Sequence, residues 1–256
     1  MTQGASPRLR FVIGGVQKGG TTALASFLGR HPGVALPEGK EAHVFDAPGF
    51  DDAWSVEAVD AQFAPHFQGA ATGAMHGDAT PIYILHPTFI RRIARYNPEM
   101  RWIILLRDPV DRALSQYHME RSRGDEHLPL WCALLAEPWR LRGHEDDFSN
   151  GSPLRHHSYR LRGDYATQLE ALHAHFPPEQ VLVLRNRDLA MSPDATMQRI
   201  YSFLGLQTPA DAVDYGRVFE GEYQRWSRND WRRRLLRWWW RAEFESQARV
   251  GWEWGQ

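Results

Sequence analysis

The chain has 256 residues, which is enough for one large domain with a substantial core. Its formal net charge of −1 gives no electrostatic reason to expect nucleic acid or an acidic polymer as a partner. The one cysteine, Cys132, excludes an internal disulfide and a cysteine-based metal cluster, and the lack of a signal peptide or a membrane-length run of roughly 20 apolar residues predicts a cytoplasmic protein.

The first elements predicted along the chain are a strand, a glycine-rich turn and a helix. The apolar, β-branched run RFVIGG predicts the strand, and TTALASFLGRHP has helical spacing that stops at Gly29 and Pro32. Further on, MRWIILLRDP predicts a second buried strand. Asp108 then suits the cap of a helix over VDRALSQYHMERSR, with Pro109 in its first turn.

The last part of the chain repeats this alternation. DYATQLEALHAHFP predicts an amphipathic helix, QVLVLRN a third buried strand, and PDATMQRIYSFLGL a helix closed by Gly205. The pattern predicts an α/β fold, a single P-loop-like domain over residues 1–256 with a central, mainly parallel sheet flanked by helices. We expect residues 1–10 to be flexible and residues 121–158, rich in His, Pro and Gly, to form a loop or insertion.

The turn GVQKGGTT looks like a phosphate-binding loop whose lysine is out of place. The nucleoside-triphosphate loop reads G-x-x-x-x-G-K-[ST], whereas here Lys18 lies inside the loop and Thr21 stands where that lysine would be. Backbone N–H groups, the helix dipole, Lys18 and the hydroxyls of Thr21 and Thr22 suit a phosphate-like anion. The alternative is a tight turn that uses glycine for its positive φ, with its lysine in solvent.

The second predicted strand ends in Arg107, where a magnesium site would need a carboxylate. An arginine at that place suits a second anionic group better than a metal. We therefore expect a ligand with two anionic groups and no metal between them.

The loop around Lys18 and the strand that ends at Arg107 together resemble motifs of sulfotransferases that use 3′-phosphoadenosine 5′-phosphosulfate (PAPS). VQKGGTTAL resembles the loop that holds the 5′-phosphosulfate, and LLRDPVDRALSQY resembles the 3′-phosphate motif, which maps to Arg107 and Ser115. PEGKEAHVFD and GDATPIY resemble segments of the heparan-sulfate-type branch, with Ala42 in place of a proline. The resemblance runs in order over residues 11–206.

The resemblance implies transfer of a sulfuryl group from PAPS to a hydroxyl or amine of a saccharide, glycolipid or specialised metabolite. Lys18 would stabilise the charge that develops as sulfur leaves, and the other loop residues would cradle the 5′-phosphate. The residues expected to bind PAPS are Lys18, Gly19, Gly20, Thr21, Thr22, Arg107 and Ser115.

The resemblance also implies a base that takes the proton of the acceptor hydroxyl. Asp78 stands where that branch has the glutamate of its Glu-x-Thr-Pro segment, and His43 is the second candidate for this role. Lys40 matches a family lysine near the sulfate, and Tyr165 matches a Gly-x-Tyr motif. The residues expected to act in catalysis are Lys18, Lys40, His43 and Asp78, and those expected to meet the acceptor are Lys40, His43, Phe45, Asp78 and Tyr83.

Residues 225–256 are rich in Trp and Arg and predict a C-terminal helix and tail. Arg225 and Trp226 are candidates to cover the adenosine. The helix could pack its Trp residues on the core, contact lipid headgroups at a membrane surface, or form a dimer contact. A glycan or small-molecule acceptor, no nucleic acid, and a monomer or homodimer are the expected partners and state.

Two other functions stay open from the sequence. A P-loop kinase or nucleotide hydrolase is disfavoured because Lys18 is out of register and no metal-binding carboxylate is evident. A catalytically inactive nucleotide-binding relative is suggested by one feature, the aspartate at position 78 in place of glutamate.

Overall fold

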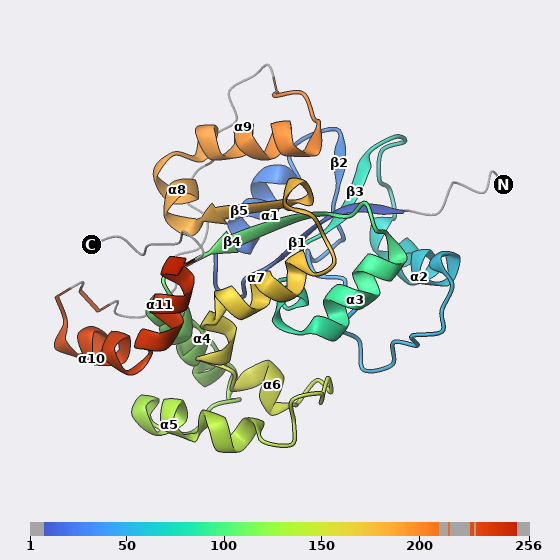
Figure 1. Ribbon diagram of the computed structural model, residues 1–256. Helices are drawn as coiled ribbons and strands as arrows, with labels where there is room; N and C mark the ends of the chain where they lie inside the picture. Colours follow the sequence, from blue (N-terminus) through green and yellow to red (C-terminus); the bar gives the residue numbers. More distant parts are fainter. Residues whose placement is uncertain (1–7, 210–214, 216–225, 228, 250–256) are drawn as a thin grey trace. The chain divides into compact units, whose positions relative to one another are not determined.

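The computed structural model describes residues 8–209, 215, 226–227 and 229–249 (Figure 1). The chain divides into two compact units, Met1–Leu106 with Ala171–Phe219, and Arg107–Glu170 with Glu220–Gln256. Residues 1–7 lie outside the described part, and Leu9 already belongs to a strand. The single domain expected over the whole chain stays a prediction.

The first unit is built on a five-stranded sheet in the order β2-β3-β1-β4-β5, with every neighbouring pair parallel. This arrangement confirms the α/β fold class and the parallel sheet that the sequence predicts. The strands are β1 Leu9–Gly15, β2 Val34–Ala35, β3 Met75–Asp78, β4 Arg101–Leu106 and β5 Val181–Arg185.

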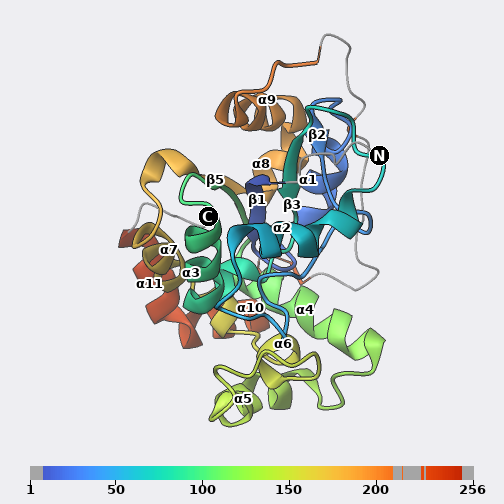
Figure 2. The ribbon, with the colours of Figure 1, turned by 90° about the vertical axis from the view of Figure 1, so that its right-hand side faces the viewer.

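Helices cover both faces of this sheet, which explains why its long strands are apolar at almost every position. Figures 1 and 2 show α1 (Thr21–Leu28), α8 (Asn186–Met191) and α9 (Pro193–Leu204) on one side of the strands and α3 (Pro87–Tyr96) on the other. Phe11 packs in one cluster with Leu24 of α1 and Ile200 of α9. Trp102 of β4 instead meets Phe176, with ring centroids 5.6 Å apart. The helical elements of this unit are α1 Thr21–Leu28, α2 Val56–Phe63, η1 Ala64–Phe67, η2 Tyr83–Leu85, α3 Pro87–Tyr96, η4 Pro178–Gln180, α8 Asn186–Met191 and α9 Pro193–Leu204.

The second unit is helical in its described residues, and its core is centred on α4 (Pro109–Arg123). Asp108 caps α4 as predicted, because its Oδ1 accepts the N–H groups of Val110 and Asp111 at 3.0 and 3.1 Å. Leu236 and Trp240 of the C-terminal segment join the same buried cluster as Val110. The helices of this unit are α4 Pro109–Arg123, α5 Leu130–Leu141, α6 Pro153–His156, η3 Leu161–Gly163, α10 Trp231–Trp239 and α11 Arg241–Arg249, while α7 Tyr165–His173 runs from this unit into the first.

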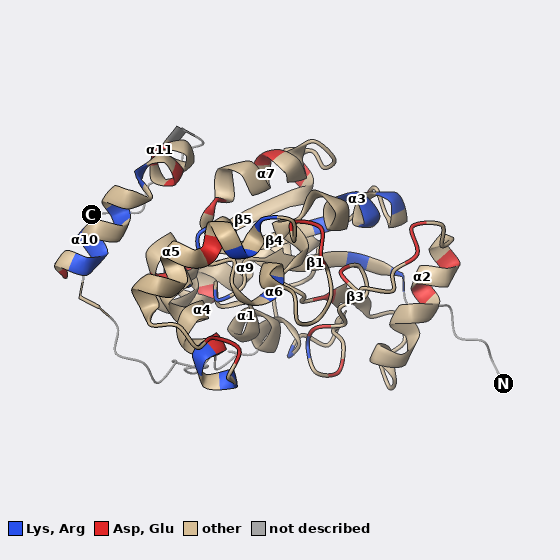
Figure 3. Cartoon of the chain, turned by 90° about the horizontal axis from the view of Figure 1, so that it is seen from below, with Lys and Arg blue, Asp and Glu red and all other residues tan. Residues whose placement is uncertain are grey.

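The C-terminal segment forms the two helices α10 and α11, where the sequence predicted a helix and a tail. Figure 3 shows basic positions along α10. Arg237 donates to Asp108 Oδ2 at 2.5 Å, so part of the positive charge of α10 is paired with a carboxylate. Trp231 and Trp238 of the same helix are 67% and 64% exposed. Arg225 and residues 250–256 lie outside the described residues. None of the helices that the structure describes has the length and apolar character needed to cross a bilayer.

Residues 121–158, expected to be loop or insertion, contain the twelve-residue helix α5. Pro138 lies inside that helix, where proline usually acts as a breaker. Two buried carboxylates hold the region in place. Glu126 binds Arg140 at 2.6 Å and Tyr159 at 2.8 Å, and Glu137 accepts the backbone N–H groups of residues 160 and 161 at 2.7 and 2.9 Å.

Candidate active site

The glycine-rich loop joins β1 to α1, and a backbone hydrogen bond connects it to β4. The Val16 N–H donates to the carbonyl of Leu105 at 3.2 Å, and the Gly19 N–H donates to the carbonyl of Val16 at 2.8 Å. A Cβ at position 19 would lie 2.2 Å from the oxygen of Leu105, so a residue with a side chain does not fit there. The close approach to β4 therefore requires the glycine.

The other end of the loop is fixed by a residue that the sequence analysis did not single out. Asn186, the first residue of α8, donates from Nδ2 to the carbonyl of Gly19 at 2.7 Å. Gly20 has φ +101°, and a Cβ there would lie 2.3 Å from the same Nδ2. Both the backbone conformation and the neighbouring amide therefore require glycine at position 20.

The first turn of α1 provides the hydrogen-bond donors of an anion site. Its N-cap is Gly20, which has no side chain to cap the helix, and its first turn contains no acidic residue. The N–H groups that begin the helix are therefore left for a ligand, and the helix dipole favours a negative charge there. Lys18 is half-buried in the loop with φ +65°, Thr21 is buried and Thr22 is exposed. The loop thus gathers the residues predicted to hold a 5′-phosphate.

Arg107 and Ser115 belong to the second unit. Arg107 is the first residue after β4, and Ser115 lies on α4, where it is buried. The hydroxyl of Tyr165 donates to the Arg107 carbonyl at 2.7 Å. The tyrosine of the predicted Gly-x-Tyr motif therefore fixes the backbone of the predicted 3′-phosphate residue.

A second group of predicted residues lies on the segment after β2. The Ala42 N–H donates to Asp78 Oδ1 at 3.1 Å, and the His43 N–H donates to Thr80 Oγ1 at 3.4 Å. Lys40 and His43 have φ +81° and +53°, a region that costs free energy for residues with a Cβ. The contacts with the end of β3 hold the segment in this conformation.

The side chains of this segment form an alternating row of charges. Lys40 Nζ pairs with Glu41 Oε1, and His43 Nε2 lies 3.2 Å from Glu41 Oε2. On its other side His43 Nδ1 lies 2.9 Å from Oδ2 of the buried Asp46. Burial lowers the pKa of His43, but the hydrogen bonds to Asp46 and Glu41 outweigh burial and raise the pKa to about 10. At neutral pH His43 is therefore an imidazolium that donates from both ring nitrogens.

Glu41 keeps its charge in this setting. Burial raises its pKa, but the hydrogen bond from His43 and the charge and hydrogen bond of Lys40 act more strongly, so the net pKa lies below its usual value of 4.5. Its side chain is 30% exposed. Glu41 is thus an ionised carboxylate that solvent can reach.

Asp78 ends β3 and is fully buried. Thr80 Oγ1 lies 3.0 and 2.9 Å from its two carboxylate oxygens, and the Tyr83 hydroxyl donates to Oδ2 at 2.5 Å. Burial raises the pKa of Asp78 to about 6, although hydrogen bonds from Tyr83, Ala42 and Thr80 act in the opposite direction. The carboxylate is therefore enclosed by hydrogen-bond donors of its own unit.

Phe45 and Tyr83, expected as walls of the acceptor site, are both fully buried. Their ring centroids lie 5.5 Å apart, and Phe45 also contacts Phe63 and Tyr96 at 5.4 Å each. These rings form the aromatic core beneath the segment 40–46. Their contact with an acceptor stays a prediction.

The comparisons with known proteins decide the family. Residues 9–229 match the family described as the sulfotransferase domain. The chain belongs to this family.

Similar proteins place this sulfotransferase near the heparan-sulfate branch, which confirms the resemblance drawn from the motifs. It is 29% identical over 207 residues to the Homo sapiens heparan sulfate glucosamine 3-O-sulfotransferase 3A1, covering 81% of this chain and 47% of that protein. It is 29% identical over 211 residues to the Homo sapiens bifunctional heparan sulfate N-deacetylase/N-sulfotransferase 2, covering 77% of this chain and 22% of that protein. The chain thus spans half or less of the length of these curated relatives.

Among solved structures, a sulfotransferase from Alicyclobacillus acidocaldarius has a TM-score of 0.75 and 27% sequence identity. The match covers 96% of this chain and 97% of that one. The similarity therefore extends over nearly the whole length of both proteins.

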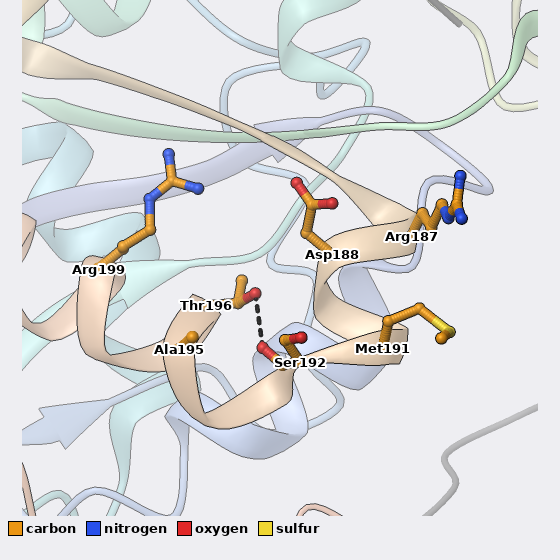
Figure 4. Close-up of a pocket in the computed structure, with 7 residues that line it drawn as sticks. All are labelled: Arg187, Asp188, Met191, Ser192, Ala195, Thr196 and Arg199. Atoms are coloured by element: carbon orange, nitrogen blue, oxygen red, sulfur yellow. Dashed lines mark hydrogen bonds between the residues drawn. The ribbon is translucent and has the colours of Figure 1, made fainter. Parts of the chain in front are cut away.

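One pocket of this sulfotransferase is lined by residues of α8, of α9 and of the link between them. It is a hollow of about 390 Å³ between α8 and α9, drawn in Figure 4, where Thr196 donates to the carbonyl of Ser192 at 2.9 Å. Its lining residues are Arg187, Asp188, Met191, Ser192, Ala195, Thr196 and Arg199. None of the residues predicted for PAPS or the acceptor is among them.

Two residues of the candidate site, Glu41 and Asn186, are not among those predicted from the sequence. Glu41 lies between the predicted Lys40 and His43 in KEAHVFD, and its place beside two cationic residues could have indicated an ionised carboxylate. Asn186 had no signal in the sequence, because its partner Gly19 is 167 residues away. Only the parallel order of the sheet explains how the two can meet.

Proposed function

We propose that this sulfotransferase moves a sulfuryl group from PAPS to a hydroxyl or amine of a saccharide, glycolipid or specialised metabolite. The observation that carries the proposal is the glycine loop, which leaves the first N–H groups of α1 for an anion and places Lys18 inside the loop. The family membership of residues 9–229 supports the same reaction.

The proposed sulfuryl-donor site uses cationic and hydroxyl groups at two phosphates. The N–H groups of Gly20 and Thr21 and the hydroxyls of Thr21 and Thr22 bind the 5′-phosphate, while Arg107 and Ser115 bind the 3′-phosphate. The residue types present fit PAPS, because the first turn of α1 has no acidic residue, and Lys18, Thr21 and Thr22 supply a positive charge and hydroxyl donors for an anion. That no metal takes part stays a prediction.

The reaction exchanges one bond to sulfur for another. PAPS supplies the sulfuryl group, and the acceptor oxygen or nitrogen forms a bond to sulfur as the bond between sulfur and the bridging oxygen of the 5′-phosphate breaks. Lys18 stabilises the charge that appears on the bridging oxygen, as cationic groups do in phosphoryl transfer. The acceptor proton goes to a carboxylate of the protein.

Two carboxylates compete for the role of base. Asp78 is the prediction from the sequence, but it is fully buried and accepts hydrogen bonds on both oxygens. Glu41 is ionised and 30% exposed, and this observation favours it as the group that meets the acceptor. We propose that Glu41 takes the proton, with Asp78 kept as the competing candidate, because an acceptor can reach Glu41 without opening the core.

Lys40 and His43 then act on the charge of Glu41 and of the transferred group. With its pKa raised to about 10, His43 stays protonated at neutral pH and orients Glu41 instead of accepting a proton itself. Lys40, bound to Glu41 in this structure, is close enough to the same carboxylate to meet the sulfuryl oxygens.

Family membership speaks against the two other functions. A P-loop kinase or nucleotide hydrolase would need its lysine directly before the Ser/Thr of the loop, and here that position is Thr21. The aspartate at position 78 is the one feature that suggested an inactive relative. It no longer does so if Glu41 is the base. A cytoplasmic location, a monomer or homodimer, no nucleic-acid partner, and peripheral membrane contact through α10 stay predictions.

The reaction is tested by transfer of labelled sulfate from PAPS to a panel of acceptors. The panel contains heparan-type oligosaccharides, simple glycosides, a glycolipid and phenolic or alkyl alcohols. Labelled product with one class and its absence with Lys18→Ala would support the proposal. Release of phosphate from ATP–Mg²⁺, with no sulfate transfer to any acceptor, would support a nucleotide hydrolase instead.

A further inference from the structure

Asn186 is the side chain that connects the last strand of the sheet to the glycine loop. It is the first residue of α8, directly after β5, and its Nδ2 donates to the Gly19 carbonyl at 2.7 Å. The side chain is partly buried, so water competes only in part for this bond. The hydrogen bond therefore acts directly on the backbone of the loop that we propose as the anion site.

The hydrogen bond fixes the direction of one peptide plane. The peptide between Gly19 and Gly20 is trans. In a planar trans peptide the C=O and the next N–H point in opposite directions. Because the carbonyl of Gly19 points at Asn186, the N–H of Gly20 points away from Asn186.

This peptide plane has little else to hold it. Both of its residues are glycines, and glycine adopts positive and negative φ about equally well. A rotation of the plane would replace the Gly20 N–H by the Gly19 carbonyl, which repels an anion. The N–H of Gly19 is already used by Val16 at 2.8 Å, so the direction of the Gly20 N–H affects how many donors the loop offers.

We propose that Asn186 is a positioning residue that locks the Gly19–Gly20 peptide with its N–H toward the 5′-phosphate of the sulfuryl donor. The inference rests on the proposed function, since it assumes that the loop binds this phosphate. The fit is tight, because a Cβ at position 20 would lie 2.3 Å from Nδ2. The glycine pair and the amide therefore depend on each other: the glycines let the amide approach, and the amide removes the freedom that the glycines introduce.

The substitution Asn186→Asp tests the direction of the hydrogen bond. Aspartate has the size of asparagine, but an ionised carboxylate has no N–H to donate. It would repel the carbonyl of Gly19 and add a negative charge next to an anion site. Asn186→Ala removes the hydrogen bond without adding charge.

Gln180 offers a matched control in the same unit. It precedes β5 as Asn186 follows it, and its Nε2 donates to the carbonyls of Pro98 and Met100 at 2.9 and 3.2 Å. Gln180→Ala removes the same kind of amide-to-carbonyl contact at the other end of the strand. A general loss of stability would appear in both variants, whereas an effect on the loop would appear only at Asn186.

The experiment measures, by calorimetric titration, the dissociation constants of 3′-phosphoadenosine 5′-phosphate and of adenosine 3′-monophosphate, which lacks the 5′-phosphate. For the bisphosphate, we expect Asn186→Ala to weaken binding about tenfold and Asn186→Asp about a hundredfold, the sizes expected for one hydrogen bond and for an added repulsive charge. Gln180→Ala should bind as the wild type does. For the monophosphate, all four proteins should bind alike.

Three results would overturn the inference. The Asn186 variants could bind the bisphosphate as tightly as the wild type, they could lose affinity for both nucleotides equally, or Gln180→Ala could lose as much. If Asn186→Ala does not fold, as judged by thermal unfolding, the equal-sized Asn186→Asp carries the test. A wild type that binds neither nucleotide would contradict the proposed function itself, which is a different outcome from wild-type binding that is insensitive to Asn186.

Discussion

The hydroxyl of Tyr83 donates to Asp78 Oδ2 at 2.5 Å, and both residues are fully buried. The other oxygen of the carboxylate accepts the N–H of Ala42 at 3.1 Å. The end of β3 thus controls the backbone next to Glu41, the carboxylate that we propose as the base. We therefore propose different tasks for the buried Asp78 and for the partly exposed Glu41.

The first prediction concerns the identity of the base. Glu41→Gln should lower kcat by ~10²–10⁴, as expected for loss of a general base, and leave the affinity for PAPS nearly unchanged. Steady-state kinetics with a saturating acceptor measure this. Glu38→Gln, an exposed residue of the same segment, is the control and should have wild-type kinetics. If Glu41→Gln is fully active and Asp78→Asn shows the large loss, Asp78 is the base.

The second prediction is the pH dependence of kcat. The pKa of Glu41 lies below 4.5, so a reaction that uses it as base should keep its rate as the pH falls from 7.5 to 5. The pKa of Asp78 is raised to about 6, so a reaction that uses Asp78 should lose half its rate near that pH. A profile of kcat between pH 5 and 7.5 separates the two. An inflection near pH 6 that is present in the wild type and absent from Asp78→Asn would contradict our assignment to Glu41.

The third prediction separates the two phosphate motifs. Lys18→Ala should lower kcat and weaken PAPS binding, whereas Arg107→Ala should mainly raise the KM for PAPS, by about 10- to 100-fold for the loss of a charged hydrogen bond. Arg123→Ala, an exposed arginine at the end of α4, is the control for removal of a positive charge. Equal KM values for Arg107→Ala and the wild type would remove Arg107 from the sulfuryl-donor site.

The fourth prediction concerns stability. The pKa of His43 is about 10 in the folded protein and 6.5 in the unfolded chain, so the protonated form favours folding. This stabilisation is complete below pH 6.5 and disappears as the pH rises through 10. The difference in free energy of unfolding between the wild type and His43→Gln should therefore shrink between pH 6 and pH 10. Urea unfolding at both pH values measures it, and a constant difference would mean that His43 does not carry this charge.

Much of the sheet could be predicted from the sequence because its strongest signals are local. The runs that form β1, β4 and β5 are apolar at almost every position, and Gly205 ends α9 with φ +72°, as a C-terminal glycine should. By contrast, β2 has two residues and β3 reads MHGD, which resembles no apolar strand. Their pairing with the rest of the sheet, not their composition, makes them strands.

The site could be predicted where a motif is contiguous, and not where distant residues meet. Lys18 and the glycines of its loop belong to one stretch, and so do Arg107 and Ser115. The contact of Asn186 with Gly19 depends on the order of the strands, and the burial of Asp78 depends on Tyr83 and on the backbone of Ala42. A pattern in the sequence records the residue types but not which carboxylate is covered.

The central claim is that the glycine loop holds the 5′-phosphate of an adenosine 3′,5′-bisphosphate without a metal. Calorimetric titration of the wild type and Lys18→Ala with 3′-phosphoadenosine 5′-phosphate in the presence of EDTA, and with ATP–Mg²⁺ in its absence, tests it most directly. We predict that the wild type binds the bisphosphate with EDTA present and more tightly than ATP–Mg²⁺, and that Lys18→Ala loses this affinity. Binding of ATP–Mg²⁺ in preference to the bisphosphate, or bisphosphate binding that is unchanged in Lys18→Ala, would contradict the account.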